Sequence, residues 1–267
     1  MSSILFLGTA GTSIVASRQL RASGGVILQL EDIQFHLDPG PGALLKGKEY
    51  GINFLQTTAI LVSCQQLSHC NDLNVVIEAM THGGIDQHGL VLGSKSVLAP
   101  LDGTYPYLTK HHRQLVEKVI PLDQNHKVGI GLVEINTLSV SQADPTAAGF
   151  KFFCPRFTLS YTGHTTVTDQ LLSELAGTDI LIVSVPFPGN TASGLYLDTE
   201  KATTLVSMIK PRVAVLTHFG LEMLKADPLV EAREIQRLTG VPTIAAHDGL
   251  KIAPESYAHH KSPVKGY

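Results

Sequence analysis

The sequence predicts an α+β fold of four layers, an αββα sandwich in which two mixed sheets pack together and helices flank them. Three observations support this prediction. Short apolar strands separated by glycine-rich turns fill the first third of the chain, strands and helices alternate in the last third, and a strand, a loop and a helix follow one another at residues 58–80. We expect a single domain over residues 1–267, made of two half-domains at roughly residues 1–135 and 136–267.

Strands come first along the chain. Apolar runs at residues 4–7, 26–30 and 33–37 have the length and composition of strands, and turns rich in glycine or proline separate them. The apolar run at residues 58–62 continues this series, and an amphipathic helix is expected after it at residues 71–80. Strand-like pieces are predicted further on, at residues 96–99, 128–135 and 150–153.

Helices and strands alternate in the last third of the chain. Helices are predicted at residues 168–176, 198–209 and 228–238, and strands at residues 180–185, 213–217 and 243–246. Asp227 and Pro228 suit the N-cap and first turn of one helix, and Gly240 follows the last apolar position of that helix. The absence of an internal repeat or a low-complexity linker favours one domain.

Composition limits the classes of function. Of the 267 residues, 43% are hydrophobic and 16% are charged, which is typical of a globular protein with a sizeable core. The sequence contains no apolar run long enough to span a membrane and no secretory signal at its N-terminus. Three cysteines form no disulfide framework and suit a reducing cytosol. A net charge of −3 gives no general attraction to nucleic acid. We therefore expect a cytoplasmic protein without membrane or nucleic-acid partners.

Short motifs follow one another in a fixed order along nearly the whole chain. They lie at residues 6–11, 38–44, 60–63, 71–72, 77–81, 161–163, 216–220 and 248–249. In this order and spacing they resemble the ribonuclease Z-like, phosphodiesterase-like branch of the metallo-β-lactamase superfamily. The resemblance implies the sandwich predicted above, with two divalent metal ions, usually zinc, held between the sheets. In that family the ions hold a hydroxide that attacks a phosphodiester, an ester or a lactam.

Most of the metal ligands that this resemblance implies are replaced in the chain. The family motif H-x-H-x-D-H falls on residues 64–69, and only His69 matches its position. The final family histidine is retained as His218, and His164 stands where a bridging aspartate is expected. Other side chains occupy five further ligand positions, which are Cys64, Gln66, Ser68, Gln142 and Tyr196. The resemblance therefore implies a degenerate metal site.

One metal position could still be filled. The resemblance places His69, His164 and His218 at the second metal, and three imidazoles with a water make a competent zinc site. Cys64 is a candidate fourth ligand, which would close that site. The first metal is not expected, because amide side chains are poor zinc ligands. In the family, carboxylates orient the ligand histidines, and here they correspond to Asp38, Asp72 and Asp248.

An ordinary structural role stays open for each candidate. His69 and His218 could equally be buried, hydrogen-bonded side chains, and His164 is expected in a solvent-facing loop rather than at a metal. Cys64 and Cys70 are expected as small buried side chains rather than as nucleophiles. The three aspartates could simply accept turn or cap hydrogen bonds. Two adjacent histidine pairs, at residues 111–112 and 259–260, are expected to be solvated.

Two functions of different classes follow. The first is a non-catalytic or strongly altered family member, with a polar pocket for binding or regulation by a small polar molecule. Such a protein would act as a homodimer or as the partner of an active paralogue. The alternative is a mononuclear metal-dependent hydrolase, of phosphodiesterase or of lactonase and esterase type, which uses the three histidines. The expected cofactor is accordingly one zinc or iron ion, or none. Transfer RNA processing is not expected, because the chain has no basic inserted arm.

Overall fold

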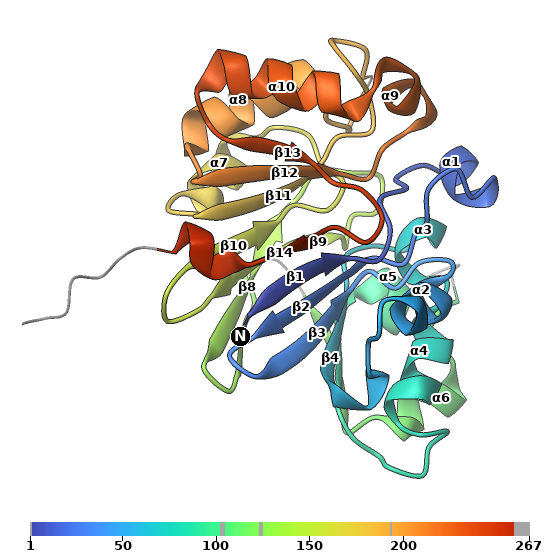
Figure 1. Ribbon diagram of the computed structural model, residues 1–267. Coiled ribbons are helices and arrows are strands. Elements are labelled where there is room, and N and C mark those ends of the chain that lie inside the picture. Colours follow the sequence, from blue (N-terminus) through green and yellow to red (C-terminus); the bar gives the residue numbers. More distant parts are fainter. Residues whose placement is uncertain (1, 102–104, 123–124, 193, 259–267) are drawn as a thin grey trace, which may run out of the picture.

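The computed structural model describes residues 2–101, 105–122, 125–192 and 194–258. Within these ranges the chain forms two sheets of seven strands each. In Figure 1 the two sheets lie one above the other, and helices cover the outer side of each. The predicted αββα sandwich of two mixed sheets is confirmed.

The first sheet contains the strands from the start of the chain and one strand from its end. They are β1 (Ser3–Phe6), β2 (Val26–Leu30), β3 (Ile33–Leu37), β4 (Thr57–Val62), β5 (Leu90–Ser94), β6 (Lys118–Leu122) and β14 (Lys251–Ile252). Their order across the sheet is β14-β1-β2-β3-β4-β5-β6. Pairing is antiparallel from β14 to β3 and parallel from β3 to β6.

The second sheet repeats this plan with the middle and end of the chain. Its strands are β7 (Lys127–Ile130), β8 (Val133–Ser139), β9 (Ala148–Phe153), β10 (Thr158–Tyr161), β11 (Ile180–Ser184), β12 (Val213–Thr217) and β13 (Thr243–Ala245). They are ordered β13-β12-β11-β10-β9-β8-β7. Pairing is antiparallel from β7 to β10 and parallel from β10 to β13.

Helices flank both sheets. Beside the first sheet lie α1 (Ser13–Ser17), α2 (Ala43–Glu49), α3 (Leu67–Cys70), α4 (Leu73–Met80), α5 (Lys95–Leu98) and α6 (Lys110–Leu115). Beside the second sheet lie α7 (Asp169–Leu175), α8 (Thr199–Ile209), α9 (Leu221–Ala226) and α10 (Pro228–Thr239). Short 3₁₀ helices, η1 (Phe54–Gln56) and η2 (Pro254–Tyr257), complete the described chain. None of the described helices is long and apolar enough to cross a membrane.

The main core lies between the two sheets, where the inward side chains of both interdigitate. Phe35 of β3 meets Phe152 of β9 edge to face, with ring centroids 5.7 Å apart. Separate apolar clusters join each sheet to its own helices. The sandwich is thus held by burial on both faces of each sheet.

Local signals fix the ends of the last helices. The Asp227 side chain accepts a hydrogen bond from the Leu229 amide at 3.0 Å, Pro228 opens α10, and Gly240 ends it with a φ of 71°. Asp198 caps α8 in the same way through the Lys201 amide, at 2.9 Å. The caps predicted for α10 are therefore confirmed.

Two predicted elements differ from the structure. Residues 96–99, expected as a strand, belong mostly to α5, and the strand precedes them as β5. An apolar run this short does not distinguish a strand from a helical turn. The helix expected at residues 71–80 is present as α4, which begins at Leu73, and the separate short helix α3 precedes it. Just before α4, the Asp72 amide donates to the Pro39 carbonyl at 2.9 Å. The expected piece at 128–135 is a hairpin, β7 and β8, which turns at Gly131 with a φ of 56°.

The parallel strands of both sheets end at the same edge of the sandwich. Side chains that follow these ends therefore meet, as ligand-binding groups of α/β sheets commonly do. Asp38 follows β3 and Cys64 follows β4, whereas His164 follows β10 and His218 follows β12. The two halves of the sandwich each supply part of one polar cluster.

Candidate functional site

Three histidines gather inside the protein at this edge. The ring centroids of His69 and His218 are 4.7 Å apart, and that of His164 lies 4.8 Å from His69 and 5.3 Å from His218. Their exposed fractions are 0%, 5% and 1% for His69, His218 and His164. His164 is therefore not in a solvent-facing loop as expected. The chain turns at Gly163, which has a φ of 59°, and His164 lies in the interior.

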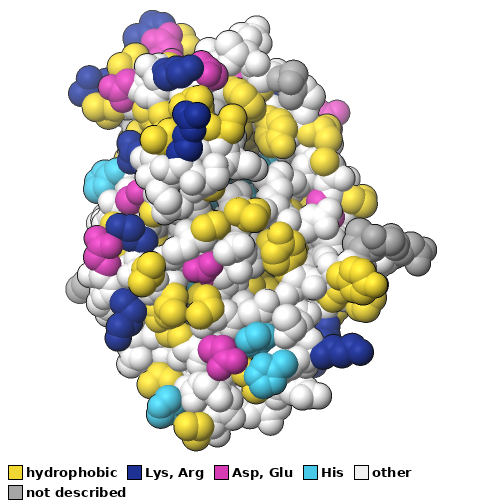
Figure 2. Space-filling model, turned by 90° about the vertical axis from the view of Figure 1, so that its right-hand side faces the viewer, with side chains coloured by type: hydrophobic (Ala, Val, Ile, Leu, Met, Phe, Trp, Pro, Cys, Tyr) yellow, Lys and Arg dark blue, Asp and Glu magenta, His cyan; other side chains and the backbone are white. Residues whose placement is uncertain are grey.

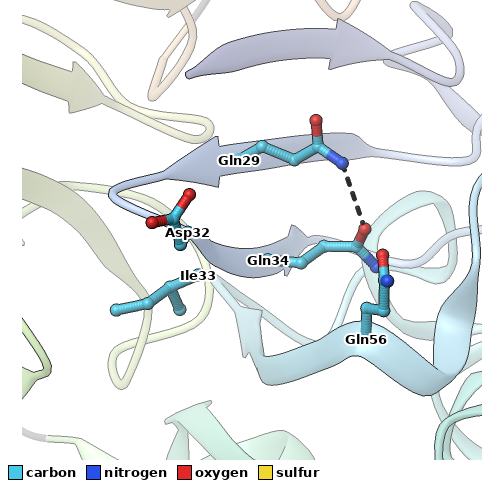
Figure 3. Close-up of a pocket in the computed structure, with 5 residues that line it drawn as sticks. All are labelled: Gln29, Asp32, Ile33, Gln34 and Gln56. Atoms are coloured by element: carbon cyan, nitrogen blue, oxygen red, sulfur yellow. Dashed lines mark hydrogen bonds between the residues drawn. The ribbon is translucent and has the colours of Figure 1, made fainter. Parts of the chain in front are cut away.

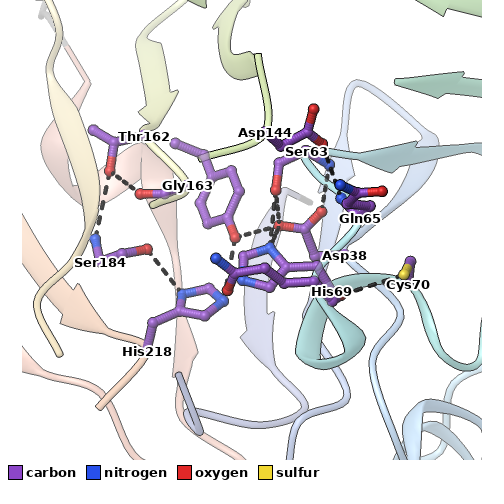
Figure 4. A network of polar contacts seen from close by, with 12 residues as sticks. Asp38, Ser63, Gln65, His69, Cys70, Asp144, Thr162, Gly163, Ser184 and His218 are labelled. Carbon is purple, nitrogen blue, oxygen red and sulfur yellow. Dashed lines mark hydrogen bonds and ion pairs between the residues drawn. The ribbon is translucent and has the colours of Figure 1, made fainter. Parts of the chain in front are cut away.

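Asp38 orients His69. Its carboxylate oxygen Oδ2 is 2.8 Å from Nδ1 of His69 (Figure 4). The carboxylate also accepts hydrogen bonds from the Ser63 amide and hydroxyl, at 2.7 and 2.8 Å, and from the Tyr161 hydroxyl, at 2.5 Å. Although burial opposes ionisation, the His69 charge and these donors hold the pKa of Asp38 below its usual value. Asp38 is thus an ionised anchor inside the protein.

The other nitrogen of His69 has no such partner. With Nδ1–H donated to Asp38, Nε2 is the atom that can bind a ligand. Within the described part of the chain, Nε2 of His69 and both ring nitrogens of His164 are buried without a hydrogen-bond partner. Burial opposes protonation of His69, yet the neighbouring Cys64 and Asp38 raise its pKa. Burial and the nearby His69 lower the pKa of His164, so that its ring is neutral.

His218 is held by two hydroxyl groups. Ser184, the last residue of β11, lies 3.0 Å from Nδ1, and the Tyr161 hydroxyl lies 3.3 Å from Nε2. Burial, with His69 and His164 nearby, lowers the pKa of His218. Ser184, His218, Tyr161, Asp38 and His69 form one chain of polar contacts, most of which Figure 4 labels.

Two residues of the cluster have unusual backbones. Asp38 has a φ of 49° and His218 a φ of 57°, in the left-handed region that side-chain-bearing residues rarely adopt. Such conformations persist where the surroundings enforce them, and they concentrate at functional sites. At His218 the constraint comes from Gly11, whose amide donates to the Phe219 carbonyl at 3.0 Å. A Cβ at Gly11 would overlap the His218 carbonyl group.

The cluster contains a group suited to a metal ion. Ligand atoms of Asp38, His69 and His218 lie within 4.8 Å of one another among the described residues. Since Asp38 already accepts four hydrogen bonds, its carboxylate is best placed to orient His69. His164 is not part of this group, although both of its ring nitrogens, like Nε2 of His69, are buried without a partner among the described residues. Orphaned buried polar atoms of this kind call for an explanation, such as a bound ion.

The substituted ligand positions have diverse surroundings. Cys64 is fully buried beside His69, and Ser68 is buried as well. Gln66 precedes α3, where its carbonyl accepts the His69 amide at 2.8 Å. Both amide atoms of Gln142 are buried without a partner among the residues described. Tyr196 packs its ring edge-on against His164, with centroids 5.6 Å apart.

The other two predicted carboxylates hold loops. Asp72 accepts a hydrogen bond from the Gly42 amide at 3.0 Å. Asp248 accepts hydrogen bonds from the Thr9 amide and hydroxyl, at 2.9 and 2.8 Å, and from the Ala22 amide at 2.8 Å. Of the three aspartates, Asp38 is the one whose carboxylate contacts an interior histidine among the described residues.

The sequence did not single out three residues of the site, namely Ser63, Tyr161 and Ser184. Ser63 and Tyr161 lie within the motifs at residues 60–63 and 161–163, so their positions carried a signal. Ser184 is a polar residue at the end of the apolar strand β11, where parallel strands place functional groups.

Surface hollows lie elsewhere. A cavity of about 460 Å³, lined by Gln29, Asp32, Ile33, Gln34 and Gln56, lies at the beginning of β3 (Figure 3), whereas Asp38 follows the end of that strand. Another, of about 490 Å³, lies at α2, η1 and α4, and its lining combines apolar residues such as Phe54 with charged ones such as Lys48 and Glu78. Neither is lined by the interior histidines.

The comparisons with known proteins agree with this geometry. A family model described as the β-lactamase superfamily domain matches residues 34–219. The chain belongs to this superfamily. An uncharacterized protein of Methanocaldococcus jannaschii is 30% identical over 252 residues, which cover 93% of this chain and 94% of that relative.

Solved structures with the metallo-β-lactamase fold match nearly the whole chain. YhfI of Bacillus subtilis has a TM-score of 0.78 at 17% identity, with 94% of this chain and 98% of that chain covered. Zn²⁺-bound PqqB of Methylobacterium extorquens has a TM-score of 0.69 at 13% identity, with 94% and 99% covered. The short form of human tRNase Z has a TM-score of 0.64 at 14% identity, with 94% and 98% covered. The predicted metallo-β-lactamase fold, in the form shared with ribonuclease Z, is thereby confirmed.

Proposed function

We propose that this metallo-β-lactamase-fold protein binds one divalent metal ion, zinc or iron, through His69, His164 and His218, and that it hydrolyses phosphoesters or lactones slowly. The unpartnered, buried nitrogens of His69 and His164 are the observation that carries the proposal. A polar atom buried without a partner costs free energy, and a metal bond would remove that cost.

The side chains suit a metal ion chemically. Neutral imidazoles bind zinc and iron, and the lowered pKa values of His164 and His218 favour the neutral form. At His69, an ion would replace the proton on Nε2 while Nδ1–H stays donated to Asp38. His218 would exchange its 3.3 Å contact with Tyr161 for the ion and keep Ser184 at Nδ1.

The protein would contribute orientation and charge. An ion bound here supplies a Lewis acid that activates water for hydrolysis. Asp38 holds the ring of His69 and balances positive charge through its ionised carboxylate. Ser184 fixes the ring of His218, and the Tyr161 hydroxyl donates a hydrogen bond to Asp38. Tyr196, packed on His164, would limit the access of water and substrate to the cluster.

A single ion is proposed instead of the family's pair. The residues at the other ligand positions are Cys64, Gln66, Ser68, Gln142 and Tyr196. Amides are poor zinc ligands, and one thiolate does not replace two imidazoles. In a two-metal site the pair of ions stabilises both the attacking and the leaving oxygen during hydrolysis. A single ion does not do this equally well, so slow turnover is expected.

A non-catalytic role in binding or regulation is the second candidate. Burial favours it, because His69 is fully buried and His164 is only 1% exposed. A hydrolase must admit its substrate to these side chains. A protein that only binds an ion needs no such access for a substrate. The same holds for a protein whose buried histidines only stabilise the fold.

Metal content tests the proposal. Protein purified without chelator is expected to hold one interior zinc or iron ion per chain, which is lost in His69→Ala and His164→Ala but kept in His247→Gln, a change at an exposed histidine. Hydrolysis of a chromogenic phosphodiester and of a lactone, with and without chelator, then separates the two candidates. Two interior ions per chain would contradict the single site, and a folded protein without interior metal would favour the non-catalytic candidate.

A further inference from the structure

A hollow of about 490 Å³ lies on the outer surface between α2, η1 and α4, and we call it the α2–α4 hollow. Phe54, Ile52 and Ala79 are among the residues that line it. Phe54 is buried in the apolar cluster beside the first sheet, and Ile52 and Ala79 pack against that cluster. The hollow therefore continues this core to the surface. Figure 2 shows hydrophobic side chains gathered on the face that carries α2 and α4, with charged side chains around them.

Two leucines beside the hollow are open to solvent. Leu45 of α2 is 76% exposed, and Leu55 of η1 is 47% exposed. Both line the hollow, so they belong to one patch and are not scattered apolar residues. Single exposed apolar side chains are common, whereas a contiguous apolar patch with a polar rim marks an interaction site. The patch thus combines a hollow with a projecting leucine next to it.

Charges of both signs lie at the rim of the hollow. Lys48 lies on α2, three positions after Leu45, and Glu78 lies on α4. Residues three apart in a helix are neighbours on its surface, so Leu45 and Lys48 share a face of α2. Atom Oε1 of Glu78 is 3.5 and 3.3 Å from Nε2 of His111 and His112, and the Glu78 side chain remains 37% exposed to further partners. The leucine and the cation are therefore on one wall, and the anion is on the other.

A second copy of the chain has the features that complement this patch. In a two-fold contact the same patch of both copies meets, so α2 of one copy faces α4 of the other. Leu45 of each copy would then enter the hollow of the other copy. Lys48 of each copy would lie opposite Glu78 of the other. Each contact is made twice, as an interface between identical surfaces requires.

We propose that the α2–α4 hollow, with Leu45, Lys48 and Glu78 beside it, is the interface of a two-fold homodimer. Burial of Leu45 against apolar side chains favours association, and the opposite charges select the orientation of the two copies. The patch shares no residue with the interior cluster. The proposal does not depend on the function proposed for that cluster.

Sedimentation equilibrium over a series of protein concentrations tests the interface. The wild type is expected to form dimers, and Leu45→Glu is expected to raise their dissociation constant at least about 10-fold, because a charge replaces a central apolar contact. Leu238→Glu is the matched control, since Leu238 is 55% exposed on α10, beside the other sheet. It is expected to leave the dissociation constant unchanged. Circular dichroism checks that both variants fold.

Charge reversal tests the orientation of the copies. Lys48→Glu and Glu78→Lys are each expected to weaken the dimer about 10-fold, because like charges then face each other. A double variant with both changes restores opposite charges across the two-fold axis. Its dissociation constant is expected to return to within about 3-fold of the wild-type value.

A wild-type chain that is monomeric at every concentration would overturn the proposal and leave the hollow to a different partner. A Leu45→Glu dimer as tight as that of the wild type would also overturn it. So would a double variant that dimerises as weakly as the two single variants, because the charges would then not face each other.

Discussion

Asp38 determines how the interior histidines are presented. It follows β3 with a left-handed backbone, and it accepts hydrogen bonds from Ser63 just after β4, from Tyr161 of β10 and from His69. Four donors around one buried carboxylate keep it ionised and immobile. The role of His69 as a ligand therefore depends on Asp38, which orients its ring and need not contact the ion itself.

Replacing Asp38 by asparagine is expected to weaken metal binding about 10- to 100-fold, because His69 loses the acceptor that fixes its ring. Competition with a chromophoric chelator measures this affinity. Asp72→Asn is a matched control, since that carboxylate accepts the Gly42 amide. Equal affinity in Asp38→Asn and the wild type would show that Asp38 does not orient the ligand.

His36 is expected to make stability depend on pH. Its Nε2 lies 2.8 Å from the Gly24 carbonyl, and burial lowers its pKa to about 4, against 6.5 for an unperturbed histidine. Between these values the unfolded chain binds a proton that the folded chain does not, so stability is complete above pH 6.5 and is lost as pH falls toward 4. The loss from this residue is about 2 kcal/mol at pH 5.

Urea unfolding of metal-free protein at pH 8 and pH 5 measures this loss. In His36→Gln the difference between the two pH values should be smaller than in the wild type, whereas His88→Gln, a change at a partly exposed histidine, should leave it unchanged. An identical difference in the wild type and His36→Gln would contradict the assignment.

Residue identities predicted part of the site. His69, His218 and Asp38 were found because motifs mark them, and the structure brings them together. The burial of His164 was not predicted, because it depends on where β10 ends and on the turn at Gly163. Sequence spacing also gives no sign that Tyr161 reaches Asp38, a residue 123 positions away.

At the scale of elements, the loop at Gly11 supports the end of β12. Ala10 pairs with Phe219 as an isolated bridge, and the Gly11 backbone lies against His218. This contact between two loops far apart in sequence holds His218 in its left-handed conformation. The space beside Gly11 is too small for the Cβ of any other residue.

Gly11→Ala is expected to destabilise the protein by about 1–3 kcal/mol, as overpacking usually does, and to reduce metal content by displacing His218. Gly129→Ala is the matched control, because a Cβ there would meet nothing within 4 Å. Urea unfolding and metal analysis of both variants check this. A Gly11→Ala protein that keeps its metal and its stability would show that the loop adapts.

The capped helix α10 and the strands β2, β3 and β12 were predicted well, whereas residues 96–99 were not. Asp227, Pro228 and Gly240 marked both ends of α10, and the cap residues do what was expected of them. Residues 96–99 were misassigned because the serines around α5 are held by distant partners. The Ser96 hydroxyl donates to Asp144 at 2.5 Å, a contact between residues 48 positions apart. The pattern of residues around positions 96–99 does not indicate a contact with a residue so distant in sequence.

For the whole molecule, the interior cluster lies where the two sheets meet. Asp38 and His69 come from the half that contains the first sheet, and His164 and His218 come from the half that contains the second. An ion bound by these histidines would therefore join the halves. Binding to the folded state alone contributes about 2.7 kcal/mol when the free metal is 100 times the dissociation constant.

Chelation is accordingly expected to lower the melting temperature by roughly 5–10 °C, since 1 kcal/mol corresponds to about 2–4 °C in chains of this size. Scanning calorimetry measures the shift. In His164→Ala the chelator effect should be abolished. A melting temperature that does not respond to chelator would mean that no ion links the halves.

The last strand, β14, pairs with β1 rather than with its neighbours in the second sheet. During synthesis the first six strands therefore emerge well before their sheet is complete. Until residues 251–252 leave the ribosome, one side of β1 presents unpaired backbone groups, which readily pair with other chains. A chain truncated before β14 is thus expected to expose the unpaired edge of β1 and to aggregate. Loss of even the few residues of β14 would therefore be harmful.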